Sequence, residues 1–296
     1  MKKSIEENSI RAGYYTAKLI TRQYAKTFYF ASRFLTKEKR NAAYSIYAAC
    51  RVSDDSVDNP EDSPSPVRLE QINKKINAAY RNQEANDSLL LAFKDTICRY
   101  QIPKRYFDEL IEGMYMDLHK NRYKDFEELY TYCYKVAGVV GLIMLNVFGY
   151  TNQEAAKYSV DLGIAMQLTN ILRDIKEDYR RGRIYLPKDE MARFGVSENH
   201  IAEGKVDENF IALLRLQIQR AKEYYHNSYK GIKMISDLKS RIVVCMMKDI
   251  YAGILQSIEN NNYDVFSKRA YVNSAGKMVI ALKILLKPKS YENQYR

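Results

Sequence analysis

Apolar residues recur at intervals of three and four along most of the chain, which is the period of amphipathic α-helices. No alternating strand-like runs and no Asn-Gly or Asp-Gly hairpin signals stand out. The six prolines, at positions 60, 64, 66, 103, 187 and 288, leave two proline-free stretches of roughly 80 to 100 residues where long helices can run. The pattern predicts an all-α fold, with residues 1–296 forming a single domain.

Two short segments interrupt this helical pattern. Residues 59–66 (NPEDSPSP) are rich in proline and serine, and they end a helix that we expect to begin near Lys39. Residues 180–187 (RRGRIYLP) contain Gly182, a helix stop, and Pro187, which opens the next helix. Each break directly follows a cluster of aspartates, so the candidate chemistry lies at these two helix ends.

The first aspartate cluster lies on one face of its predicted helix. Tyr47, Arg51, Asp54 and Asp58 are spaced 4, 3 and 4 residues apart. At ~100° per residue they occupy one stripe roughly 60° wide, and Asp55 lies beside it. This face therefore presents two carboxylates one helical turn apart.

The second cluster repeats the design. Gln167, Asn170, Asp174 and Asp178 are spaced 3, 4 and 4 residues apart, which predicts one polar stripe on a continuous helix. Two carboxylates at this spacing stand about 6 Å apart along the helix axis, suited to Mg²⁺ ions that keep some water and share the oxygens of a diphosphate.

Each pair alone could be ordinary solvated charge near a helix end. The helix dipole opposes aspartate at a C-terminus, however, and two matching stripes are better explained by a functional demand. Two such helices facing each other would clamp diphosphates through a small metal cluster. Arg51, Arg173 and Arg183 could then bind phosphate oxygens directly.

Composition and net charge limit the classes of partner that the chain can bind. With 46% hydrophobic and 28% charged residues the chain is typical of a globular protein that folds in water, and its formal net charge is +11. Such charge favours nucleic acid, anionic lipid or phosphorylated substrates. A nucleic-acid module would leave the aspartate stripes without a role and would gather its basic residues on one face, so we expect no nucleic acid partner.

We expect a cytoplasmic protein. The N-terminal residues lack the apolar core of a secretory signal, and the most apolar run, residues 139–150, is about half as long as a membrane-spanning helix. The four cysteines are scattered and predict reduced thiols, and the three histidines are too far apart to suggest zinc.

With these residues in view, the chain resembles the squalene/phytoene synthase family over about residues 20–290. Residues 47–58 (YAACRVSDDSVD) are similar to the first aspartate-rich motif of that family, and residues 167–187 (QLTNILRDIKEDYRRGRIYLP) to the second, which is the more specific signal. Weaker matches follow in the family's order: AKTFYFAS at 25–32, EGMYMDL at 112–118, YCYKVAGVVG at 132–141 and YDVFSKRAYV at 263–272.

The resemblance implies an all-α isoprenoid-synthase helical bundle around a central cavity. It also implies a prenyl transferase that joins two prenyl diphosphates head to head, using two or three Mg²⁺ ions for which Mn²⁺ can substitute. The implied metal ligands are Asp54, Asp58, Asn170, Asp174 and Asp178.

The other expected site residues come from the same motifs. Besides the aspartates, the implied catalytic residues are Tyr47, Arg51 and Tyr132. The implied substrate-binding residues are Lys26, Thr27, Phe28, Ser32, Asp117, Gln167, Asn170, Arg173, Arg183, Tyr251 and Arg269. The small residues of 136–141 (VAGVVG) would admit either a prenyl tail or a neighbouring helix.

Ser32 decides part of the substrate prediction. One turn after Phe28, a small residue on a cavity helix leaves room for a longer tail, which favours a C40 product. We expect two geranylgeranyl diphosphates to give phytoene through a cyclopropylcarbinyl diphosphate, without NADPH. The alternative is a C30 enzyme that uses farnesyl diphosphate to make presqualene diphosphate, dehydrosqualene or squalene. Hydrophobic substrates and the positive net charge of the chain also predict peripheral membrane contact. The sequence does not predict the oligomeric state.

Overall fold

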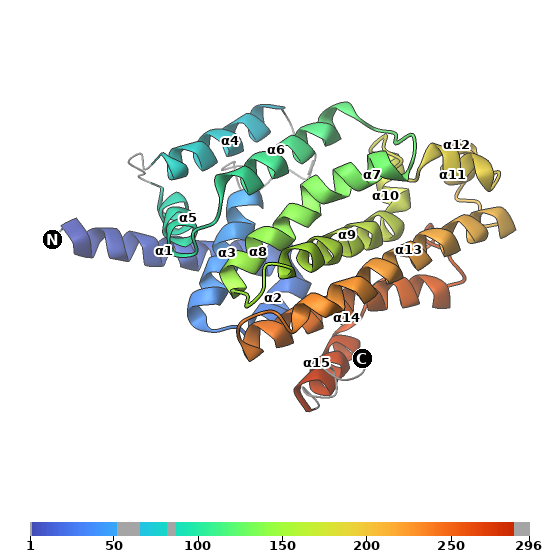
Figure 1. Ribbon diagram of the computed structural model, residues 1–296. Helices are drawn as coiled ribbons and strands as arrows, with labels where there is room; N and C mark the ends of the chain where they lie inside the picture. Colours follow the sequence, from blue (N-terminus) through green and yellow to red (C-terminus); the bar gives the residue numbers. More distant parts are fainter. Residues whose placement is uncertain (1, 52–65, 82–86, 287–296) are drawn as a thin grey trace.

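The computed structural model describes residues 2–51, 66–81 and 87–286. Within these ranges the chain is built of helices and contains no β-strand (Figure 1). Two isolated bridges, Arg122 with Ile184 and Tyr150 with Ile235, join loops and do not form a sheet. The prediction of an all-α fold is confirmed.

In chain order the elements are α1 (Lys2–Tyr24), α2 (Lys26–Ser32), α3 (Lys37–Arg51), α4 (Pro66–Tyr80), α5 (Ser88–Arg99), α6 (Lys104–His119), α7 (Phe126–Cys133), the π-helical turn η1 (Tyr134–Gly138), α8 (Val139–Phe148), α9 (Ala155–Arg173), α10 (Ile175–Arg180), α11 (Lys188–Arg193), α12 (Glu198–Glu203), α13 (Glu208–Ile232), α14 (Leu238–Asn260) and α15 (Ser274–Leu286).

Local sequence fixes many of the helix ends. Pro66 is the first residue of α4, and Pro103 and Pro187 directly precede α6 and α11, where the missing N–H does no harm. Gly182, beyond α10, has φ +78°, which glycine adopts without strain, so the predicted stop is confirmed. Four N-cap aspartates accept a backbone N–H at the starts of α5, α7, α13 and α14: Asp87, Asp125, Asp207 and Asp237.

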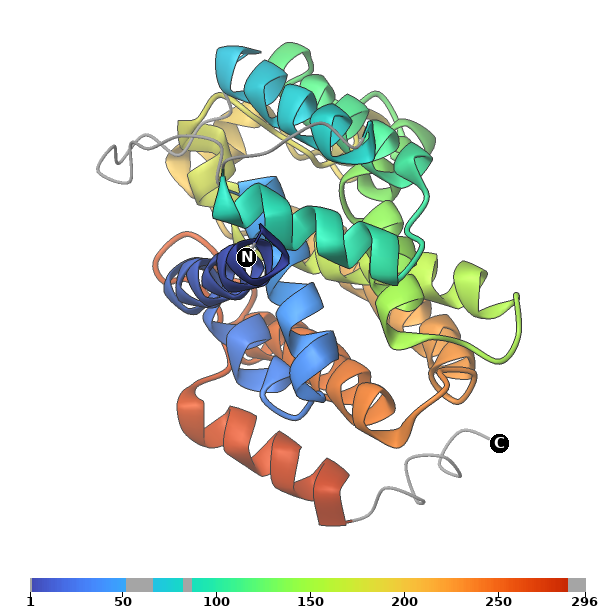
Figure 2. The same ribbon diagram turned by 90° about the vertical axis from the view of Figure 1, so that its left-hand side faces the viewer.

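Helix α9 lies at the centre of the bundle. It packs along α13 and also contacts α8, η1 and α14 (Figure 1). One large group of buried apolar side chains joins α2 to α6 with α8, α14 and α15, and a second joins α7 with α9 to α14. Helices α1 and α15 lie at the outside of the bundle, where α15 stands at one edge in both ribbon views (Figures 1 and 2).

Glycines allow α9 to cross η1 and α8 at close range. A Cβ atom on Gly163 would lie 2.3 Å from the carbonyl oxygen of Ala137, and one on Gly141 would lie 2.2 Å from that of Ser159. Both distances are far below van der Waals contact, so any larger side chain would push the helices apart.

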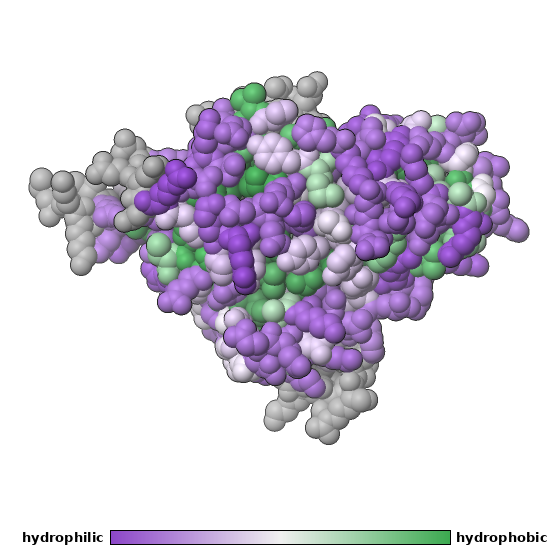
Figure 3. Space-filling view, turned by 45° about the horizontal axis from the view of Figure 1, so that its top comes forward, coloured by the Kyte–Doolittle hydropathy of each residue, from purple (hydrophilic) through white to green (hydrophobic). Residues whose placement is uncertain are grey.

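On the face seen in Figure 3, hydrophilic residues cover most of the surface and hydrophobic residues show between them near its middle. One continuous helical stretch in the described part of the chain, Phe126–Phe148, is long and apolar enough to cross a membrane. Half of its most apolar 18-residue segment is buried inside the protein. Core helices of soluble proteins show the same combination of length and burial, so the structure is compatible with a soluble protein.

Candidate active site

A cavity of about 430 Å³ lies inside the bundle, with walls from α2, α3, α6, η1, α8, α9, α13 and α14. Its lining follows α9 from Ala155 to Asn170, a length of about 22 Å at 1.5 Å per residue. The walls are mostly apolar, and Gln167 and Asn170 mark a polar end. Five predicted site residues line this cavity: Phe28, Tyr47, Gln167, Asn170 and Tyr251.

The small residues of η1 and α8 face both the cavity and a neighbouring helix. Ala137 and Gly141 line the cavity. Gly141 also lies against the backbone of α9, and Gly163 of α9 lies against the backbone of η1 on the other side of the crossing. The π-helical turn in this wall is an element that often marks functional sites.

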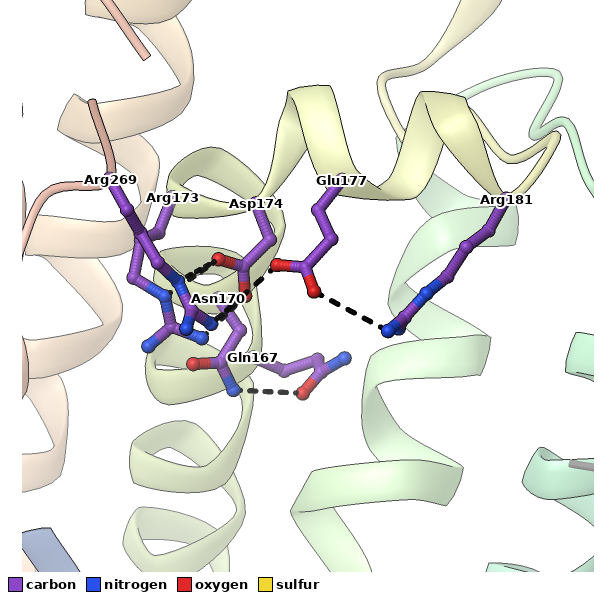
Figure 4. A network of polar contacts seen from close by, with 7 residues as sticks. All are labelled: Gln167, Asn170, Arg173, Asp174, Glu177, Arg181 and Arg269. Atoms are coloured by element: carbon purple, nitrogen blue, oxygen red, sulfur yellow. Dashed lines mark hydrogen bonds and ion pairs between the residues drawn. The ribbon is translucent and has the colours of Figure 1, made fainter. Parts of the chain in front are cut away.

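The second aspartate motif lies where α9 meets α10 (Figure 4). The prediction of one continuous helix is wrong here, because Asp174 has φ −108° and ψ 15° and separates two helices. The i to i−4 hydrogen bonds nevertheless continue through the bend: the Asp174 N–H donates to the Asn170 carbonyl at 2.9 Å, and the Asp178 N–H donates to that of Asp174 at 2.8 Å. The bend reorients α10 without uncoupling it from α9.

Two arginines bind the Asp174 carboxylate. Arg269 donates through Nε at 2.8 Å and Nη2 at 3.1 Å, and Arg173 donates through Nε at 2.9 Å and through Nη2 (Figure 4). Burial tends to raise the pKa of Asp174, but the two guanidinium groups outweigh it and the pKa is lowered. Asp174 is therefore ionised, and two predicted substrate-binding arginines lie beside it.

Asp178 and Asn170 have the opposite environment. Burial, followed by the negative charge of Asp174, raises the pKa of Asp178 to about 7, although Arg181 and Arg183 act against it. The amide nitrogen of Asn170 donates to Gln167 Oε1 at 3.4 Å, while its buried Oδ1 has no hydrogen-bond partner among the described residues. A metal ion bound here would fit both groups, because it would add positive charge beside Asp178 and give Asn170 Oδ1 a partner.

The described residues do not form a complete metal site on their own. Among them, no three His, Cys, Asp or Glu side chains converge closely enough to hold an ion. A cation held by Asp174, Asp178 and Asn170 would take its other ligands from water, from a diphosphate or from further aspartates. Asp54, Asp55 and Asp58 lie outside the described residues, so their predicted roles stay predictions.

Asp117 forms a second polar cluster beside the first. It accepts hydrogen bonds from Tyr185 Oη at 2.7 Å and Tyr132 Oη at 2.9 Å, and the two rings stack with centroids 5.1 Å apart. Arg183 Nη2 donates to the Asp117 carbonyl at 3.0 Å, and its charge acts on both Asp117 and Asp178. Burial raises the pKa of Asp117 despite these three groups.

Tyr185 was not among the predicted site residues, although it stands within the second motif, two positions after Arg183. Burial raises the pKa of both Tyr132 and Tyr185. Each phenol therefore stays protonated and donates a hydrogen bond to the Asp117 carboxylate. The position of Tyr185 within the second motif was the signal in the sequence that could have identified it as a site residue.

Lys26 and Thr27 lie at the start of α2, where they meet α15. Lys277 Nζ donates to Thr27 Oγ1 at 2.9 Å, and Lys26 is exposed. Burial, followed by repulsion from Lys26, lowers the pKa of Lys277. Sequence reasoning missed Lys277, whose only signal is that it is one of two lysines, with Lys283, in the mostly apolar residues 274–286.

Aromatic contacts hold two predicted site residues of α3, Tyr47 and Arg51. Tyr47 packs against Phe28 with ring centroids 6.2 Å apart. The Arg51 guanidinium lies over the Tyr24 ring, 4.9 Å from its centroid. Each of these contacts holds a predicted site residue against α1 or α2.

Ser32 requires a correction. It does not line the cavity: it is fully buried, with Oγ 2.9 Å from Tyr44 Oη and 3.1 Å from the Tyr29 carbonyl oxygen. One turn after Phe28, α2 has already turned this position toward α3, so the size of Ser32 does not set the depth of the cavity. The expectation of a C40 product cannot rest on this residue.

Comparison with known proteins agrees with this architecture. The family model described as squalene/phytoene synthase matches residues 21–275. The chain is 40% identical over 284 residues to the 15-cis-phytoene synthase of Synechococcus elongatus, covering 91% of each chain. It is 41% identical over 263 residues to the chloroplastic phytoene synthase 1 of Arabidopsis thaliana, covering 86% of this chain and 62% of that one.

The fold is also that of solved relatives. A crystal structure of a dehydrosqualene synthase in complex with ligand superimposes with a TM-score of 0.88 at 28% identity, covering 97% of this chain and all of that one. The helical bundle, its apolar cavity and its acidic end define an isoprenoid synthase fold, which confirms that prediction. The chain belongs to the squalene/phytoene synthase family.

Proposed function

We propose that this chain is a phytoene synthase, which condenses two geranylgeranyl diphosphates head to head into 15-cis-phytoene. The observation that carries the proposal is the 40% identity to the 15-cis-phytoene synthase of Synechococcus elongatus over 91% of both chains. The two substrates would release two diphosphates and two protons, with no reductant consumed. NADPH is therefore not a cofactor in this proposal.

The polar end of the cavity would bind the diphosphates. Arg173 and Arg269 already present two guanidinium groups at one point, a geometry that suits phosphate oxygens. Asp174, Asp178 and Asn170, with Asp54 and Asp58, would hold the Mg²⁺ ions. Bound there, Mg²⁺ would supply Lewis-acid stabilisation of the leaving diphosphate.

The apolar walls would control what happens after the carbon–oxygen bond breaks. They exclude water, which would otherwise capture the allylic cation as an alcohol. The rings of Tyr47 and Tyr251 line the cavity and can stabilise positive charge. The first cation would be captured by the double bond of the second substrate with loss of a proton, giving a cyclopropylcarbinyl diphosphate that ionises, rearranges and loses a second proton.

Mg²⁺ binding can be tested without turnover. Adding MgCl₂ with inorganic diphosphate should raise the melting temperature of the wild-type chain, because the ligands bind only the folded state. Asn170→Leu, which removes the unpartnered oxygen, should reduce this shift. An equal shift in both proteins would contradict the assignment of Asn170 to the metal site.

A C30 enzyme is the second candidate, favoured by one observation. The dehydrosqualene synthase structure matches this chain over 97% of its length with a TM-score of 0.88. Its sequence identity of 28% is lower than the 40% shared with the phytoene synthase, so we rank it second. The cavity and its polar end would serve farnesyl diphosphate through the same steps.

The deciding experiment supplies purified protein and Mg²⁺ with radiolabelled geranylgeranyl or farnesyl diphosphate, with and without NADPH. A C40 hydrocarbon formed independently of NADPH, and lost in Asp54→Asn and Asp174→Asn, would support phytoene synthesis. A C30 product from farnesyl diphosphate alone would support the second candidate. No product from either substrate would overturn both.

We also propose that the protein works in the cytoplasm, in peripheral contact with a membrane. Substrate and product are both greasy, and the chain carries a formal net charge of +11, which suits an anionic lipid surface. Fractionation of cells that express the chain would test this, since a peripheral protein leaves the membrane in high salt.

A further inference from the structure

Helix α15 presents an apolar face to the outside of the molecule. Met278, Val279, Leu282, Leu285 and Leu286 are between 39% and 79% exposed. At ~100° per residue these five side chains form one stripe about 120° wide. We call this stripe the outer face of α15.

The inner face of the same helix is well packed. Ala281 and Ile284 are buried, 1% and 2% exposed, in the core group that includes residues of α14. Helix α15 is therefore a fixed part of the bundle that holds its outer face at the edge of the molecule (Figures 1 and 2).

The exposed large apolar side chains of the described residues are concentrated on and just before α15. Eleven large apolar side chains in the described ranges are exposed, and five of them belong to α15, while Tyr271 lies just before it. The others are spread over α1, α4 and the start of α14. Single exposed apolar residues are ordinary, but a contiguous stripe marks an interaction surface.

The charge around this face indicates its partner. Residues 265–291 contain no Asp or Glu. Lys283 is exposed on α15 beside the outer face, Lys268 is exposed in the segment before the helix, and Lys287 and Lys289 follow in the sequence. An apolar stripe flanked by lysines matches an anionic bilayer, where acyl chains take the apolar residues and headgroups the lysines.

The position of α15 relative to the cavity fits the same partner. Lys277 on its inner face donates to Thr27 of α2, and the next residue of α2, Phe28, lines the cavity. Helix α15 also packs on α14, another wall of the cavity. A bilayer against the outer face would lie close to elements that enclose the prenyl chains.

We propose that the outer face of α15 docks the protein on an anionic lipid bilayer. This inference deepens the membrane contact proposed above and rests on it, whereas it is independent of which hydrocarbon is made. The protein would lie on the bilayer surface, with α15 parallel to the membrane plane.

The test compares two pairs of substitutions in the full-length chain. Val279→Gln with Leu282→Gln removes two side chains of the outer face, each 49% exposed. Val67→Gln with Leu238→Gln removes the same two residue types from α4 and from the start of α14, outside the outer face, where they are 68% and 53% exposed. Near-ultraviolet circular dichroism would confirm that both variants are folded.

Binding would be measured by cosedimentation with vesicles of phosphatidylcholine, alone or with about one-third phosphatidylglycerol. We expect the wild-type chain to bind the anionic vesicles and to be released by high salt. The α15 pair should weaken this binding at least about tenfold, because two apolar side chains that would insert among the acyl chains are replaced by polar ones. The control pair should bind like the wild type.

Three results would overturn the inference: no vesicle binding by the wild type, equal weakening by both pairs, or a wild-type dimer that the α15 pair dissociates while vesicle binding is unchanged. The last result would assign the outer face to a second copy of the chain. Hydrocarbon synthesis in detergent would be measured in parallel. If the chain binds vesicles through α15 but makes no hydrocarbon in detergent, the result supports docking and overturns only the proposed synthase function.

Discussion

The two ends of the central cavity are built on different physical principles. At the polar end, Asp174 and Asp178 stand four residues apart in one motif, yet the pKa of Asp174 is lowered and that of Asp178 is raised to about 7. At the apolar end, between α8 and the start of α9, side chains such as Leu145, Phe148 and Ala155 meet without any charge. Electrostatics shapes the first end and packing shapes the second.

This difference shows how one helix can serve both ends. Helix α9 supplies Ala155 and Ser159 to the apolar walls and Gln167 and Asn170 to the polar end. At the apolar end a change of volume should matter most, because close-packed interiors do not absorb extra atoms. At the polar end a change of charge at constant volume should matter most. The following substitutions test this division.

The largest effect is expected at Asp178. Asp178→Asn keeps the volume and removes the charge that we assign to a metal ligand, so it should lower the rate of hydrocarbon synthesis by about 10²–10³-fold. Glu177→Gln is the matched control, because Glu177 is exposed and pairs with Arg181 at 3.3 Å. It should change the rate less than about threefold. Similar rates for the two variants would contradict a special role for Asp178.

The next effect concerns the helix crossing in the cavity wall. Gly163→Ala places a Cβ 2.3 Å from the Ala137 carbonyl oxygen, so it should lower the free energy of unfolding by about 2–3 kcal/mol, measured by urea denaturation. Gly182→Ala has open space around it and φ +78°, and should cost only about 1 kcal/mol. A smaller loss at Gly163 than at Gly182 would show that the crossing can relax.

A third substitution tests cavity depth. Ser159 lines the cavity from α9, and Ser159→Phe would fill the space beyond it. Turnover of geranylgeranyl diphosphate should fall at least about tenfold relative to that of farnesyl diphosphate, because the longer tail loses its room. Ser159→Ala should leave this ratio unchanged. An unchanged ratio would contradict the proposal that the longer tail extends past Ser159.

The smallest effect is expected at Tyr185, which donates to Asp117 at 2.7 Å. Burial raises the pKa of Asp117, so stability from this carboxyl is full below the ordinary aspartate pKa of about 4 and is lost as the pH rises through its folded value. Tyr185→Phe removes a donor to the charged form and raises this pKa further. It should lower the free energy of unfolding by about 1 kcal/mol at pH 7 and by less at pH 4.

Urea denaturation at the two pH values would check this last prediction. Tyr130→Phe provides a control, because Tyr130 lies on the same helix as Tyr132 and packs against Phe126 and Tyr224. Its effect should not change between the two pH values. A loss at Tyr185 that grows at pH 4 would reverse the assigned sign.

The sequence predicted the parts of the site that depend on short-range order. Gln167 and Asn170 lie on one face because they are three residues apart, and both line the cavity as their spacing suggested. Gly182 and Pro187 mark helix ends because their backbone chemistry allows little else. The bend at Asp174 was not predictable in this way, since every residue around it can continue a helix.

Contacts between distant segments could not be derived from spacing. Lys277 meets Thr27 across 250 positions, and Arg269 meets Asp174 across 95. Ser32 was assigned to the cavity from its distance to Phe28, yet α3 covers that side of α2 and binds Ser32 through Tyr44. Which face of a helix looks into a cavity depends on its neighbours, and these come from elsewhere in the chain.

By itself the sequence determined the all-α fold, the break at Gly182 and the two aspartate motifs that identify the family, because periodicity, proline, glycine and charge act within a few residues. The predicted break at residues 59–66 lies almost entirely outside the described residues. Tertiary structure alone decided that the pKa of Asp174 is lowered while the pKa of Asp178 is raised. It also decided that Tyr185 donates a hydrogen bond to Asp117 and that α15 exposes apolar side chains. Burial and pairing depend on which distant segments pack together, and that information is distributed over the whole chain.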